Sequence, residues 1–140
     1  MVPSEEVIAG AIYRPSYISL EYALARYGII PEMPYTITSV TTRATASFLV
    51  RGKNFSYKKI KREAFTGYVP ERIDGQTIFM ADPEKALVDY LYFVSLGKKT
   101  MNDRMMLSRL ERKKLISYAR LFGREGLNKL VKDVLEMKPS

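Results

Sequence analysis

The fold is decided by one stretch, DPEKALVDYLYFV, which spans residues 82–94. Asp82 is a favoured N-cap residue, Pro83 suits the first helical position, and Glu84 places a negative charge in the first turn. The residues that follow are apolar nearly all round, and Gly97 is expected to stop the helix. Since such a helix is mostly buried, other parts of the chain must cover it.

Strands are predicted before this helix. Residues 35–40 alternate in a Thr-rich, β-branched run that is typical of a strand. Residues 46–50 and 55–60 flank a turn with Gly and Asn, and residues 68–69 and 76–80 flank an Asp-Gly dipeptide. Each of these pairs predicts a hairpin. The fold class expected from this order is α+β, with a small antiparallel sheet, a buried helix and a basic C-terminal helical tail.

Further helices are expected at both ends of the chain. Ser4 can cap a short helix before Tyr13, and Ser16 or Ser19 can start a second helix that Gly28 stops. The tail predicts a helix from Asn102 or Asp103 through Leu110, a second from Arg112 to Phe122, and a terminal helix with an apolar stripe at Leu127, Leu130, Val131, Val134 and Leu135.

The 140 residues fit one domain by length. We expect residues 1–13 to be a residual linker helix and residues 14–140 to form one domain. Within that domain, residues 14–97 would be the α+β core and residues 98–140 the basic helical tail. The N-terminus lacks the charge and hydrophobic pattern of a secretory signal, so a cytoplasmic protein is expected.

Composition excludes several kinds of chemistry. Cysteine and histidine are both absent, which removes structural zinc, cysteine nucleophiles and histidine acid-base catalysis. The 23 Lys and Arg against 15 Asp and Glu give a net charge of +8, which favours association with nucleic acid or another polyanion. Residues 98–140 alone hold twelve Lys and Arg against five Asp and Glu.

A second basic region, residues 38–62, has seven cations and no carboxylate. Its aromatic residues alternate with polar ones, so it is either the solvated face of a sheet or a binding face. The tail cations, which include Arg104, Lys114, Arg124, Lys129 and Lys132, are either ordinary helix surface or phosphate contacts. The predicted nucleic-acid or partner-binding residues are Arg43, Arg51, Lys53, Lys58, Lys59, Lys61, Arg62, Arg109, Arg112, Lys113 and Arg120.

Two other functions stay open. A small metal-dependent nuclease or phosphotransfer enzyme would use carboxylates that converge in three dimensions, with Lys85 among them. The candidate carboxylates for that enzyme are Asp74, Asp82, Glu84 and Asp89. A structural oligomerisation domain would instead expose a large apolar patch on the terminal helix. We predict no catalytic residue, no metal site and no cofactor.

Four segments, in order, resemble the region that follows the helix-turn-helix in AbiEi-type antitoxins. They are RPSYISL at residues 14–20, YTITSVTTR at residues 35–43, FSYKKIK at residues 55–61 and DPEKALVDYLY at residues 82–92. These proteins are the antitoxin halves of type IV, abortive-infection toxin-antitoxin systems. The resemblance covers residues 13–92 and extends more loosely through the helical tail.

The resemblance implies an N-terminal winged helix-turn-helix that represses the operon and a C-terminal domain that counteracts a nucleotidyltransferase-like toxin. About a dozen residues precede Arg14. We therefore expect this chain to hold the antitoxin part without the winged helix, either as a piece of a longer protein or as a naturally short homologue. The expected partners are the toxin and, through non-specific contacts, DNA of the chain's own operator.

Overall fold

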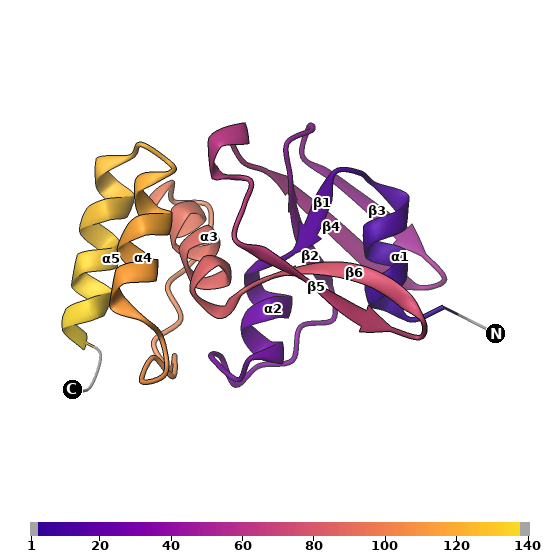
Figure 1. Ribbon diagram of the computed structural model, residues 1–140, viewed down its shortest axis with the longest axis horizontal. Helices are drawn as coiled ribbons and strands as arrows, with labels where there is room; N and C mark the ends of the chain where they lie inside the picture. The colour runs from indigo at the N-terminus through magenta and orange to yellow at the C-terminus, as the bar shows by residue number, and fades with distance from the viewer. Residues whose placement is uncertain (1–2, 138–140) are drawn as a thin grey trace.

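The computed structural model describes residues 3–137 (Figure 1). Residues 1–2 and 138–140, at the outer ends of the expected linker and helical tail, lie outside the described residues. The α+β class is confirmed. The helices are α1 (Glu5–Ile12), α2 (Leu20–Arg26), the short 3₁₀ helix η1 (Arg62–Ala64), α3 (Pro83–Ser95), α4 (Arg112–Arg120) and α5 (Glu125–Met137). The strands are β1 (Ser16–Ile18), β2 (Ile37–Thr41), β3 (Ala46–Val50), β4 (Lys53–Lys59), β5 (Tyr68–Ile73) and β6 (Gln76–Ala81).

The prediction of a small antiparallel sheet is wrong, because the six strands form one mixed sheet in the order β3-β4-β2-β1-β6-β5. β2 pairs in parallel with β4, and β1 pairs in parallel with β6. Burial explains why β4 takes the place beside β2. Phe55 and Tyr57 of β4 are buried, whereas the middle of β3 is exposed and forms the sheet edge.

β1 replaces the start of the helix that was expected at Ser16. Its Tyr17 and Ile18 are buried between β2 and β6, so the strand is central although it has three residues. Ser19 then becomes the N-cap of α2. Serine begins strands and helices alike, and a strand of three residues shows no period that sequence analysis can detect.

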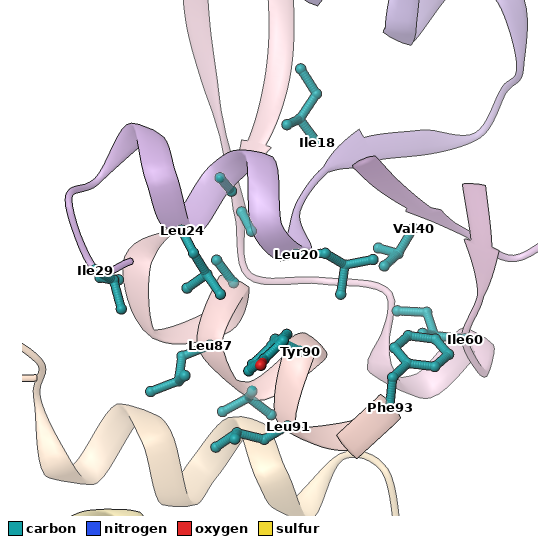
Figure 2. Close-up of a cluster of buried hydrophobic side chains, with 14 of the residues drawn as sticks. Ile18, Leu20, Leu24, Ile29, Val40, Ile60, Leu87, Tyr90, Leu91 and Phe93 are labelled. Atoms are coloured by element: carbon teal, nitrogen blue, oxygen red, sulfur yellow. The ribbon is translucent and has the colours of Figure 1, made fainter. Parts of the chain in front are cut away.

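Helices cover both faces of the sheet. On one face, the Tyr57 hydroxyl donates a hydrogen bond of 2.5 Å to the Ala9 carbonyl of α1. Side chains alternate along a strand, so Val40 points to the opposite face. There it joins the cluster that α2 and α3 form around residues such as Leu20 and Leu87 (Figure 2). This cluster is the main core of the molecule.

α3 is buried as predicted, and its N-terminus is capped by Asp82, whose Oδ1 accepts the backbone N–H of Lys85 at 2.8 Å. α4 and α5 stack beside it at one end of the molecule, whereas α1 lies at the other end (Figure 1). The apolar stripe of α5 faces inward, because Leu127, Val131 and Val134 are buried. It therefore does not form the exposed patch that an oligomerisation domain would need.

The helix expected from Asn102 or Asp103 through Leu110 is wrong, since this segment has no regular structure. The Asn102 side chain accepts the Arg104 backbone N–H at 2.8 Å, which turns the chain locally. The Met106 backbone N–H pairs with Ile29 of another segment at 2.8 Å. Tertiary contacts thus take the backbone bonds that a helix would need. Within residues 3–137, no helix has the length and apolar character that crossing a membrane requires.

Candidate functional site

A charged network lies at the centre of the fold. Lys85 Nζ contacts Asp89 Oδ1 at 2.6 Å, and both side chains are 0% exposed. The Tyr17 hydroxyl donates to Asp89 Oδ2 at 2.9 Å, and the Ser19 hydroxyl donates to the same oxygen at 2.8 Å. Lys85 Nζ also donates to the Tyr17 hydroxyl oxygen at 2.7 Å. The network joins α3 to β1 and to the start of α2.

Burial controls the ionisation of this network. It raises the pKa of Asp89, although Lys85 and the two hydroxyl groups act in the opposite direction. Burial, followed by the charge of Asp89, also raises the pKa of Tyr17 well above its usual range. Among the enzyme candidates, Lys85 and Asp89 are thus brought together, but no substrate can reach them. No local pattern in the sequence indicates that Tyr17 and Ser19 are their partners.

The two carboxylates at the start of α3 hold α4 in place. Asp82 Oδ2 accepts the Tyr118 hydroxyl at 2.5 Å and contacts Lys114 Nζ at 3.0 Å. Glu84 contacts Lys114 at 3.3 Å and accepts the Glu111 backbone N–H at 2.9 Å. Burial and the hydrogen bond to Asp82 raise the pKa of Tyr118 to about 12. Burial lowers the pKa of Lys114, but Asp82 and Glu84 outweigh this effect and raise it.

The fourth enzyme candidate, Asp74, lies in the tight turn between β5 and β6 rather than beside α3. Within residues 3–137, no three Asp or Glu side chains come together in a way that could hold a metal ion. Of the four candidate carboxylates, Asp82 and Glu84 meet at Lys114, and no third carboxylate joins them in the part of the chain that the structure describes.

Three of the seven cations predicted in residues 38–62 hold the fold together. Lys53 forms an ion pair of 3.3 Å with Glu5 of α1. The Arg43 guanidinium donates to the Arg14 carbonyl at 3.1 Å and lies 4.1 Å from the centre of the Tyr13 ring. Lys61 Nζ donates to the Phe122 carbonyl at 3.2 Å, beyond the end of α4. These residues are less available to a partner than the sequence suggested.

The other four, Arg51, Lys58, Lys59 and Arg62, make no side-chain hydrogen bond or ion pair with any residue in 3–137. Arg51 is the most informative of them. It and Gly52 have φ values of +52° and +78°, which is the conformation of a type I′ turn. Asn, Asp and Gly are favoured at the first of these positions, so an arginine there is held at a conformational cost.

Lys58 lies in an open, polar groove of about 640 Å³ on the face of β2, β3 and β4. Hydroxyl and amide side chains line this groove, among them Ser47, Asn54 and Ser56. Tyr35 stands at its edge and is 89% exposed. A sheet face of this kind offers hydrogen-bond donors and acceptors and two cations, Lys58 and Lys99, of which Lys99 forms an ion pair with Glu21.

The tail cations separate into two groups in the structure. Arg104 pairs with Glu32, Lys114 pairs with Asp82, and Arg124 binds the end of α3 through Ser95. By contrast, no side-chain hydrogen bond or ion pair joins a second group to any described residue. That group consists of Arg109, Arg112, Lys113, Arg120, Lys129 and Lys132.

Arg120, Lys129 and Lys132 line a groove of about 520 Å³ between α4 and α5. Ile116 and Val131 are among its apolar lining residues, and Glu125 is its one carboxylate. We call it the α4–α5 groove. Of the eleven predicted binding residues, only Arg120 lines it. Lys129 and Lys132 are among the tail cations named from the sequence. Their position beside Arg120 depends on how α4 packs against α5, which the spacing of residues in the sequence does not reveal.

Comparisons with protein-family models and with curated proteins gave no match for this chain.

Proposed function

We propose that this chain is a cytoplasmic regulatory domain of the AbiEi antitoxin type, which counteracts a nucleotidyltransferase-like toxin and contacts DNA through phosphates. It acts as a binding module without chemistry of its own. The basic helical segment formed by α4 and α5 is its polyanion-binding part, and the tip of the β3–β4 hairpin assists it.

One line of support comes from the four segments that carry the resemblance. They form neighbouring elements, namely β1, β2, β4 and α3. The first and the last segment also meet in one buried network, in which Tyr17 and Ser19 bind Asp89. A set of segments that together build one sheet and the helix against it is what a shared fold requires.

The observation that carries the proposal is the division of charge. Asp82, Glu84 and Asp89 are bound to partners within the chain, whereas Arg120, Lys129 and Lys132 gather around one groove without an ion pair to any residue in 3–137. Converging unpaired cations favour a polyanion with regularly spaced charges. Such contacts orient a protein on DNA without reading its sequence.

The test is the salt dependence of DNA binding. Fluorescence anisotropy with a short labelled duplex from the chain's operator is recorded at several salt concentrations, for the wild-type chain and for the triple variant Arg120→Gln, Lys129→Gln and Lys132→Gln. Removing three phosphate contacts should make the slope of log K against log salt less steep by about 3.

A charge-matched variant provides the control. Arg51→Gln, Lys59→Gln and Arg62→Gln remove the same three charges from the hairpin region. The hairpin variant should change the slope less than the groove variant does. Equal losses would mean that net charge, rather than the α4–α5 groove, drives binding. If the wild-type chain does not bind the duplex even at low salt, the DNA part of the proposal is wrong.

A further inference from the structure

A separate cavity is lined by residues of α1, β1 and β6. α1 lies at the end of the molecule away from α4 and α5 (Figure 1). The volume of the cavity is about 450 Å³, and its walls come from α1, the start of β1, the segment before β5, and β6. The register of β1 and β6 joins these two strands only at Ile18 and Met80. The cavity is lined by Ser16 and Ile78, on the N-terminal side of that point, where the two strands are not paired.

One wall of this cavity is aromatic. The Tyr68 ring centre lies 5.5 Å from that of Phe65 and 5.5 Å from that of Phe79. Tyr68 is also stacked on the buried Tyr17 at 4.8 Å, which fixes its position. Phe79 is 44% exposed and Tyr68 is 38% exposed, so the rings present apolar surface to whatever enters. Ordered aromatic rings of this kind are a platform for a flat ring.

Two of the polar side chains at the cavity differ in exposure, because the Ser16 hydroxyl is enclosed whereas Arg14 is exposed. Among residues 3–137, Ser16 Oγ is the one buried side-chain polar atom without a hydrogen bond. Leaving a buried hydroxyl unbonded is costly, and buried polar groups in proteins are nearly always paired. Arg14 also lines the cavity, and its Nε donates to the Gly10 carbonyl at 3.1 Å. No other side-chain bond joins that guanidinium to a described residue, so its two terminal nitrogens are available.

We infer that this cavity binds a nucleoside monophosphate unit. The base lies against the wall of Phe65, Tyr68 and Phe79, and the phosphate is bound by Arg14. Small-molecule sites have this composition, with apolar walls and a few polar groups, and volumes of about 300–1,000 Å³. Arginine is well suited to a phosphate because it offers two parallel N–H groups. The inference does not rest on the proposed antitoxin function.

The test compares matched ligands by isothermal titration calorimetry of the full chain. AMP carries both the base and the phosphate, adenosine lacks the phosphate, and ribose 5-phosphate lacks the base. AMP should bind at least tenfold more tightly than either fragment, because each fragment loses one of the two contacts. A short 5′-phosphorylated oligonucleotide is titrated in parallel. Binding of the oligonucleotide alone would identify a nucleic-acid end as the source of the unit, and binding of AMP would identify the free nucleotide.

Variants of residues at the cavity test whether AMP binds there. Arg14→Gln should weaken AMP about tenfold and leave adenosine unchanged, whereas Phe79→Ala should weaken both. Lys98→Gln is the charge-matched control, because Lys98 is exposed and lies outside the cavity. Ser16→Ala should leave the affinity for AMP unchanged, because Ser16 Oγ is closed to solvent, and the melting temperature should stay the same or rise, since the change removes an unbonded hydroxyl. The inference is overturned if neither AMP nor the oligonucleotide binds, or if Arg14→Gln and Lys98→Gln have the same effect.

Discussion

Lys85 and Asp89, one helical turn apart on α3, form an ion pair of 2.6 Å that is closed to solvent on both sides. Their remaining hydrogen bonds go to Tyr17 and Ser19, at the centre of the sheet. Because an ion pair in the interior is stable only when its other hydrogen bonds are also made, we expect this register of α3 on β1 to be favoured over others. The pair therefore helps to specify how the helix sits on the sheet.

Removing one partner of the Lys85–Asp89 ion pair should lower the free energy of unfolding strongly. Asp89→Ala leaves the Lys85 ammonium buried without a counter-charge and should cost about 3–5 kcal/mol of the free energy of unfolding. Adding Lys85→Met to Asp89→Ala should restore part of that loss, so the two effects will not add. Urea denaturation measures both. Asp133→Ala, at an exposed carboxylate of α5, is the control. Additive losses would show that the pair does not act as a unit.

The chain passes close to this network at Gly67. Its φ is +80°, and a Cβ there would lie 2.7 Å from Lys85 Cγ and 3.0 Å from Tyr118 Cζ. Gly75 has a similar φ of +74° but nothing within 4 Å. Gly75→Ala should cost about 1–2 kcal/mol from the backbone alone, and Gly67→Ala about 1–3 kcal/mol more from the clash. Chemical denaturation of the two variants separates these causes; equal losses would refute the close packing at Gly67.

The raised pKa of Tyr118 leads us to expect a loss of stability at alkaline pH. Its folded-state pKa is raised to about 12, above the unfolded value of about 10, because the phenol is partly buried and because its hydrogen bond to Asp82 requires the protonated form. That contribution is fully present below about pH 10 and is lost as the pH rises through about 12. Tyr118→Phe should therefore lose less stability than wild type between about pH 10 and pH 12. Urea midpoints measure this, with Tyr35→Phe, an exposed tyrosine, as control.

We predict that Arg51 contributes to DNA binding and lowers the stability of the fold. Arg51→Asn places a favoured residue in the type I′ turn and should stabilise the fold by about 0.5–1 kcal/mol. The same change should lower the slope of log K against log salt for DNA by about 1. Asp74→Asn, in the other hairpin turn, should leave stability nearly unchanged. Greater stability with an unaltered salt slope would identify Arg51 as a turn residue only.

Local signals predicted part of the fold. The cap at Asp82 and the Asp74-Gly75 turn depend on neighbouring residues, so both elements were found from sequence. β1 and the loop at residues 101–110 depend on distant contacts, such as that between Met106 and Ile29, and were missed for that reason. The parallel pairing of β2 with β4 is likewise a property of the whole sheet.

The candidate site shows the same division. Residue type identified the basic regions, but it could not separate Lys61, which binds the Phe122 carbonyl, from Lys59, which makes no such bond. Nor could it place Lys129 and Lys132 beside Arg120, because that grouping depends on the packing of α4 against α5. The charge of a side chain follows from its residue type. Whether that charge is already paired within the fold depends on residues that are distant in the sequence.

The most direct test of the proposed function is growth rescue. This chain is co-expressed with the nucleotidyltransferase-like protein that the resemblance implies is encoded beside it. We predict that the wild-type chain restores growth, and that Asp89→Ala does not because it unfolds. Circular dichroism of the purified chain establishes that it is folded. A folded wild-type chain that fails to restore growth would contradict the proposal that this domain carries the antitoxin activity.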